Sequence, residues 1–233
     1  MKRILCCGLI SATFVVPSRT FAEPTVRAQF VGCKSDGQMG PQPSPTSHAD
    51  IPRLPASLAG SLAYYKSTYL GVLAPRGWHC FGLYGSNGEI LLVTPTGIGR
   101  NIFDAHLVGS AVQLSVSIGD TSGRFEAARI AARLFPNRAS FVDGVVKEGI
   151  EPKSDFPTGP FPTDITRRHG PDVVEFETPA NREGMGTQSR LVKNRDPIDG
   201  FVAMDNDNDA TVLVVRLPPA MRNLIPTIVK ATE

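Results

Sequence analysis

The sequence lacks most of the motifs that would identify an enzyme. Its 233 residues include only four Cys, four His and one Trp. No GxSxG nucleophile turn, HExxH helix or SxxK motif occurs, which excludes the most recognisable hydrolase classes. The glycines of 94–101, TPTGIGRN, are not followed by the lysine of a phosphate-binding loop, so this stretch is interpreted as a turn. We expect no cofactor.

The chain also has no apolar run long enough to cross a membrane. The run ILCCGLISATFVV at 4–16 has 13 residues, whereas a spanning helix needs about 20. Lys2 and Arg3 precede it, and the sequence TFA at 20–22 has small residues at the cleavage positions. We therefore predict a signal peptide over 1–22 and an exported protein, periplasmic or secreted. The alternative is a buried N-terminal element.

A strongly basic surface is missing as well. The net charge is +2, and removing 1–22 takes away three bases and no acid, which leaves 21 bases against 22 acids and a net charge of −1. Such a chain has no basic stripe for phosphate groups, so no nucleic-acid partner is expected. It has no polybasic or amphipathic segment either, so we expect no stable membrane anchor once the signal peptide is removed.

Only two cysteines remain after the signal peptide, Cys33 and Cys80. An exported chain meets an oxidising compartment, where such a pair usually forms a disulfide, here across 47 residues. The alternative is a metal site that combines both cysteines with His79 and His48, since zinc prefers thiolate and imidazole ligands. Because no CxxC or HxxxH spacing occurs, we expect the disulfide and no metal.

The distribution of proline divides the mature chain into two parts. Residues 37–55 are rich in Pro, Ser and Gly, so 23–56 is expected to be an extended N-terminal arm that the disulfide clamps to the body. Residues 57–233 form the expected globular domain. Its first segment, 57–66, has Leu58, Leu62 and Tyr65 at helical spacing and is predicted to be a short helix.

The segment 70–94 is predicted to contain a β-hairpin. Asn87-Gly88 separates the apolar runs WHCFGLYG and EILLVTP, and both residues tolerate the positive φ of a hairpin turn. Alternation along the first run puts Trp78 and Tyr84 on one face, and His79 among apolar neighbours on the other. Trp78 and Tyr84 are therefore candidate ligand-binding residues.

Short strands and helices are interspersed in the rest of the chain. Residues 111–118 alternate apolar and polar side chains, which predicts a half-exposed strand. No βαβ repeat occurs, so the expected fold class is α+β, a largely antiparallel sheet of hairpins with two or three packed helices. The further expected elements are helices at 122–135, 140–149 and near the C-terminus, and strands at 172–179, 198–204 and 211–217.

Two polar loops could carry a site. The loop 181–190 contains Glu183, Gln188 and Arg190 beside two glycines, and these three side chains are candidate binding residues because function often resides on such loops. The acidic run DNDND at 205–209 begins like a calcium loop but has Ala and Arg where that loop requires Gly and Glu. It is interpreted as a solvated hairpin tip.

Two functions are compatible with these residues. The first is a non-catalytic binding domain for a small ligand, an envelope component or another protein. The second is a hydrolase of envelope or extracellular substrates, in which His79 acts as a base beside Asp36, brought near the hairpin by the disulfide. The second requires His79 to be exposed and within roughly 2.6–3.2 Å of a carboxylate.

Four segments resemble uncharacterised exported bacterial proteins: GCKSDGQMGP, VLAPRGWHCFGLYGSNG, TPANREGMGTQSRL and VRLPPAMRNL. Together they touch most of the mature chain. The resemblance implies an exported bacterial protein and supports the pairing of Cys33 with Cys80. It implies no activity and no catalytic residue.

Overall fold

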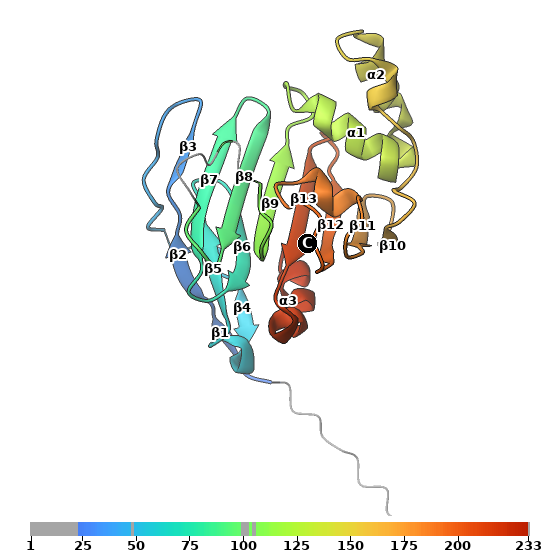
Figure 1. Cartoon of the computed structure of the whole chain (residues 1–233). Coiled ribbons are helices and arrows are strands. Elements are labelled where there is room, and N and C mark those ends of the chain that lie inside the picture. Colours follow the sequence, from blue (N-terminus) through green and yellow to red (C-terminus); the bar gives the residue numbers. More distant parts are fainter. Residues whose placement is uncertain (1–22, 48, 99–102, 104–105, 233) are drawn as a thin grey trace, which may run out of the picture.

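An eight-stranded β-sheet forms the centre of the protein (Figure 1). The computed structural model describes residues 23–47, 49–98, 103 and 106–232, so the predicted signal peptide lies outside the described part. Within it there are 13 strands in mostly antiparallel sheets, three α-helices and one disulfide, Cys33–Cys80. The α+β fold class is confirmed.

The central sheet has the strand order β10-β11-β12-β13-β9-β8-β7-β3. Every neighbouring pair is antiparallel except β3 and β7, which run parallel. The bounds are β3 (Ser35–Gly37), β7 (His79–Gly85), β8 (Gly88–Thr94), β9 (Ala111–Ser117), β10 (Ile165–Arg168), β11 (Val173–Thr178), β12 (Ile198–Met204) and β13 (Ala210–Arg216).

A second sheet packs on one face of the central sheet, which we call the core face. Leu91, Leu114 and Leu213 point to this face and form one buried cluster with Leu73 of the second sheet and Ile228 of the C-terminal helix. The elements on this side are β2 (Gln29–Gly32), β5 (Leu62–Lys66), β6 (Gly71–Pro75) and α3 (Ile225–Lys230), with the ribbon β1 (Thr25–Arg27) and β4 (Arg53–Pro55) beside them.

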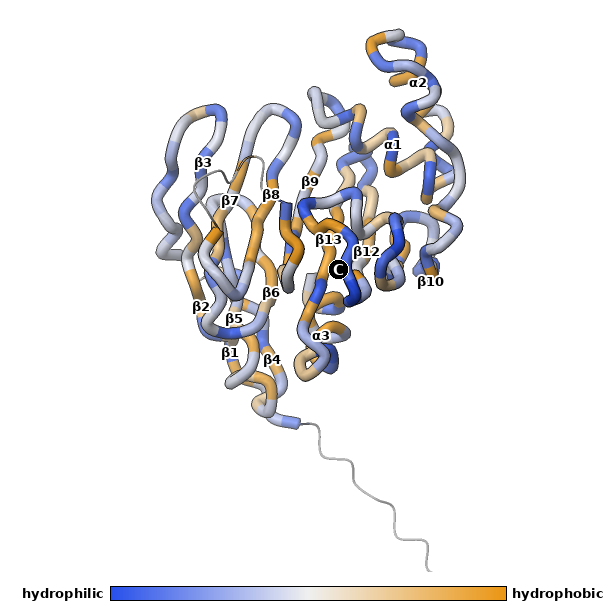
Figure 2. Tube along the Cα trace, in the orientation of Figure 1, coloured by the Kyte–Doolittle hydropathy of each residue, from blue (hydrophilic) through white to orange (hydrophobic). Residues whose placement is uncertain are grey.

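Helices cover the opposite side, which we call the helix face. α1 (Arg124–Leu134) buries Ala127 and Ile130 in a cluster with Val212 and Val214 of β13, and α2 (Ala139–Lys147) packs on α1. The predicted helices at 122–135 and 140–149 are confirmed. Figure 2 shows the apolar central strands between these layers. The 3₁₀ helices are η1 (Ala56–Leu58), η2 (Pro136–Arg138), η3 (Lys153–Asp155), η4 (Met185–Gln188) and η5 (Pro219–Leu224).

The predicted hairpin is confirmed, with a turn one residue earlier than expected. Gly85 pairs with Gly88, so Ser86 and Asn87 form the turn. Of the residues 85–88, only Gly88 has a positive φ, at +134°. A Cβ there would stand 1.9 Å from the Val116 carbonyl oxygen on β9, so the close approach of β8 and β9 requires glycine at this position.

The predicted helix over 57–66 is wrong. Only 56–58 is helical, as η1, and 62–66 is strand β5, between β2 and β6. Leu62, Ala63 and Tyr65 are each 0% exposed and belong to the main buried cluster, so side chains on both faces of this strand are covered. Tertiary burial therefore overrides the helical spacing of three apolar residues.

The N-terminal arm adds strands to all three sheets. β1, β2, β3 and β4 all lie within 23–56, and β2 and β3 pair in parallel with β5 and β7. Cys33 lies between β2 and β3, is 1% exposed, and forms the disulfide with Cys80 of β7. The expected clamp between the arm and the hairpin is therefore present.

Candidate functional site

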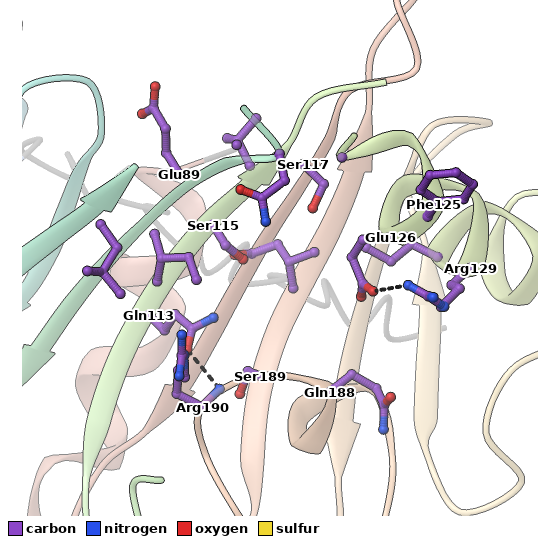
Figure 3. Close-up of a pocket in the computed structure, with 18 of the residues that line it drawn as sticks. Glu89, Gln113, Ser115, Ser117, Phe125, Glu126, Arg129, Gln188, Ser189 and Arg190 are labelled. Carbon is purple, nitrogen blue, oxygen red and sulfur yellow. Dashed lines mark hydrogen bonds and ion pairs between the residues drawn. The ribbon is translucent and has the colours of Figure 1, made fainter. Parts of the chain in front are cut away.

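A pocket of about 560 Å³ lies on the helix face, where β8 and β9 meet α1 and the loop 185–190 (Figure 3). This volume is within the roughly 300–1,000 Å³ of small-molecule sites. Its main polar side chains are Gln113, Ser115 and Ser117 of β9, Glu126 and Arg129 of α1, and Gln188, Ser189 and Arg190 of the loop.

Gln113 is the most deeply buried polar group of the pocket, with 4% of its surface exposed. Its Oε1 accepts a hydrogen bond of 3.0 Å from the backbone N–H of Arg190. An N–H donor requires the amide oxygen on that side, which leaves the amide nitrogen as the free end. That nitrogen has no partner among the described residues and is a fixed donor in the pocket.

The loop that carries Arg190 is held by two polar side chains, the half-buried Asp164 and the buried Thr178. Asp164 accepts hydrogen bonds from the Met185 N–H at 2.7 Å and the Thr178 hydroxyl at 2.8 Å. The Thr178 hydroxyl in turn accepts from the Gly186 N–H at 2.9 Å. Burial raises the pKa of Asp164, whereas these hydrogen bonds and Arg133 lower it. Asp164 and Thr178 therefore hold the backbone of Met185 and Gly186, at the start of the loop, in place.

Arg216 of β13 fixes the other end of the loop. It is 1% exposed, and its guanidinium donates to the Val108 carbonyl at 3.0 Å and to the Val192 carbonyl at 2.5 Å. Burial lowers its pKa, with Asp196 opposing. Backbone hydrogen bonds also join Leu107 to Arg190 and Val192. The backbone on both sides of Arg190 is therefore held in place.

The side of the pocket near α1 contains three charged side chains that are joined by ion pairs. Arg129 donates to Glu126 at 3.1 Å and to Glu151 at 2.5 Å, so two carboxylates share one guanidinium. All three residues line the pocket. This side therefore has one negative charge in excess. Across the pocket, the Arg190 guanidinium is half-buried and makes no ion pair or hydrogen bond with any described residue.

Glu89 borders the pocket but its side chain belongs to the other side of the sheet. It pairs with Tyr84 and Val116, so strand alternation turns it to the core face, and in Figure 3 it points away from Gln113. Burial raises its pKa to about 7. Its titration is therefore a property of the hairpin end rather than of the polar pocket floor.

The predicted binding residues separate into two groups. Gln188 and Arg190 line the pocket. Tyr84 borders it, but Tyr84 pairs with Glu89, so its side chain lies on the core face, where its hydroxyl donates to the Gly40 carbonyl. Trp78 lies at the far end of the hairpin and packs, partly buried, against the main core. Glu183 is exposed and forms an ion pair of 2.8 Å with Lys193 outside the pocket. The structure therefore brings together only part of the predicted set.

The predicted pair of His79 and Asp36 is not assembled. Asp36 lies opposite Leu83, four residues along β7 from His79, or about 13 Å at the usual strand rise. The Asp36 carboxylate accepts the Gly37 N–H instead. His79 is exposed at the end of its strand, so the expectation that it lies among apolar neighbours is wrong.

Metal binding finds no support in these residues. The disulfide occupies both Cys33 and Cys80, which contradicts the thiolate site, and His48 lies outside the described residues. In the acidic loop, the Asp205 carboxylate accepts the N–H groups of Asp207 and Asp209. No group of three metal-binding side chains occurs in the described part of the chain.

Among the described residues, no helix is long and apolar enough to span a membrane.

A second pocket, of about 770 Å³, lies on the core face between β10, β11, β12 and α3. Two of its three carboxylates form ion pairs, because Glu175 lies 3.1 Å from His169 and Asp199 lies 3.5 Å from Arg222. Burial raises the pKa of Asp199, Arg222 lowers it, and Glu177 raises it. This surface has no deeply buried donor or acceptor directed at a ligand, so the first pocket is the better candidate.

Comparison with known proteins adds nothing to this choice. No protein-family model, curated protein or solved structure matches the chain. The site therefore depends on geometry alone. Sequence reasoning missed Gln113, Ser115 and Ser117 because their alternation is also that of a solvent-exposed strand face. The expected half-exposure is wrong for Gln113, which is 4% exposed and is hydrogen-bonded to the loop.

Proposed function

We propose that this is an exported, disulfide-stabilised protein that binds a small polar ligand in the pocket on the helix face. The proposal depends chiefly on Gln113. Gln113 is 4% exposed and lines the pocket, so a ligand acceptor placed on its amide nitrogen gains a hydrogen bond from a donor that is already held in position. The carboxamide is already oriented by the Arg190 N–H, so binding requires little reorganisation.

Export is part of the proposal because of the disulfide and the predicted leader. Disulfides persist in oxidising compartments and are rare in the cytosol. The pairing of Cys33 with Cys80 is compatible with that location, as is the resemblance to exported bacterial proteins. The ligand would then be met in the periplasm or the medium.

A binding role is favoured over the hydrolase alternative by the composition of the pocket. Its described lining includes serines but no histidine or cysteine, so no imidazole stands beside a hydroxyl. A nucleophile needs an adjacent base within hydrogen-bond distance. His79 and Asp36, the residues of the hydrolase hypothesis, lie outside this pocket.

A thermal-shift screen of the mature oxidised protein tests the proposal. The probes are sugars, cell-wall fragments, amino acids, lipids and nucleotides. A ligand at 100 times its dissociation constant adds about 2.7 kcal/mol, a Tm increase of roughly 5–10 °C for a chain of this size.

Two substitutions locate any shift that is observed. Ser115→Tyr fills the pocket floor, and Ser154→Tyr places the same ring at an exposed site outside the pocket. The proposal requires a shift that Ser115→Tyr removes and Ser154→Tyr preserves. No shift with any probe class, or a shift retained in Ser115→Tyr, would contradict it.

A further inference from the structure

We infer that the ligand is a zwitterion of the amino-acid or short-peptide class. Its carboxylate would bind Arg190 and Gln113, and its ammonium would bind Glu126. The inference rests on the proposed function, since it names the ligand class of the same pocket. Three features carry it: an unpaired cation beside a buried donor, an excess carboxylate across the pocket, and neutral hydroxyls between them.

The end of the pocket that contains Arg190 and Gln113 is suited to an anion with two acceptor atoms. The Arg190 guanidinium has no partner among the described residues, and Gln113 presents a free amide nitrogen beside it (Figure 3). Arginine binds planar carboxylates through two parallel hydrogen bonds, and an amide N–H₂ supplies a further donor. A neutral ligand would leave this half-buried cation unpaired.

The opposite end of the pocket, which contains Glu126 and Arg129, is suited to a cation. Glu126 and Glu151 share Arg129, so the three charges sum to −1. The Oε2 of Glu126 accepts the hydrogen bond from Arg129. The other oxygen of this carboxylate has no partner among the described residues. A ligand ammonium placed there would balance the excess charge and donate to that oxygen.

The two ends are separated, which favours a ligand with opposite charges at its two ends. In Figure 3, Gln113 and Arg190 lie on one side of Ser115, and the Glu126–Arg129 pair lies on the other. The pocket volume of about 560 Å³ exceeds what one ammonium or one carboxylate group needs. Ser115 and Ser117 can hydrogen-bond to a peptide group between the ends.

Calorimetric titration with matched dipeptides tests this inference. The probes are dialanine with free ends, N-acetyl-dialanine, which lacks the ammonium, and dialanine amide, which lacks the carboxylate; L and D forms are both used. Dialanine is expected to bind about 10-fold or more tightly than either blocked form, because each loses hydrogen bonds to a charged group. Equal binding of all three would overturn the inference.

Charge-removing variants assign each end. Arg190→Ala is expected to weaken dialanine binding roughly 10-fold to 100-fold, and Glu126→Gln to weaken it about 10-fold. Arg182→Ala, in the same loop, and Asp143→Asn, on α2, are exposed controls outside the pocket and should leave affinity unchanged. Arg190→Ala should bind dialanine amide as well as the wild type does, which a merely unfolded loop would not.

The outcomes separate this inference from the proposed function. If another probe class binds and Ser115→Tyr abolishes its binding, while all dipeptides fail, the pocket is a binding site and the zwitterion inference is wrong. If dialanine binds equally to wild type and Ser115→Tyr, the proposed pocket is wrong as well.

Discussion

Removing the disulfide should lower the stability of the protein by about 4 kcal/mol. The perturbation is the double substitution Cys33→Ala/Cys80→Ala. The bond joins residues 47 positions apart, and the chain-entropy relation for a loop of this length gives about 4 kcal/mol at 25 °C. For a chain of roughly 210 residues, this corresponds to a Tm lower by roughly 8–16 °C.

The native contacts around the bond should survive the substitution. Cys33 also donates its backbone N–H to the Lys66 carbonyl, and β3 pairs with β7 on the other side of the bond. The loss should therefore arise mainly in the unfolded state, which becomes less constrained. Guanidinium unfolding should accordingly show a larger m-value together with a lower extrapolated free energy of unfolding.

Reduced wild-type protein is the control for the two lost sulfur atoms. It should match the double variant, because both lack the cross-link and differ only in side chains. A loss below about 1 kcal/mol, with reduced and oxidised protein equally stable, would refute the entropic reasoning. It would mean that strand pairing alone holds the arm to the hairpin.

Three further predictions concern the pocket and its hairpin. Asp164→Ala should lower the free energy of unfolding by about 2–4 kcal/mol, because it leaves the Met185 N–H and the Thr178 hydroxyl without their partner. Hydrogen exchange should accelerate across 184–187, and unchanged exchange would contradict the assigned role. Gly88→Ala should lower the free energy of unfolding in urea by more than about 2 kcal/mol, because the added Cβ would meet the Val116 carbonyl. Gly97→Ala is the control, because the space around Gly97 is open. Burial raises the pKa of Glu89 from 4.5 to about 7, so the native state binds this proton more tightly than the unfolded state. The contribution of Glu89 to the free energy of unfolding should be fully present below pH 4.5 and lost as the pH rises through 7. Glu89→Gln should flatten the dependence of stability on pH over that range.

Local signals in the sequence were sufficient for several elements. The hairpin was predictable because apolar runs flank a turn with glycine, and α1 because its apolar stripe ends at Pro136. The disulfide was predictable once 1–22 is set aside as a signal peptide, since the two of the four cysteines that remain allow only one pairing. In each case the deciding residues lie close together in the chain or admit one partner.

The pocket was only partly predictable because its polar groups acquire their meaning from distant segments. Gln188 and Arg190 belong to a loop whose composition indicates a site. Gln113 alternates with apolar neighbours as a solvent-facing residue does, yet it is 4% exposed and accepts a hydrogen bond from Arg190, 77 residues away. The strand at 62–66 was missed for the same reason, since its partners β2 and β6 determine its conformation.

The short strand β3 has a consequence for the chain before its disulfide forms. Three residues of the arm cover part of the outer edge of β7, and among the described strands β3 is the terminal strand on that side of the sheet. An uncovered edge offers unpaired N–H and C=O groups to any other extended chain. In a reduced chain whose arm has separated, the hairpin could pair with the same hairpin of a second molecule. We therefore expect the arm to limit self-association, and the disulfide to keep the arm in place as long as it stays oxidised.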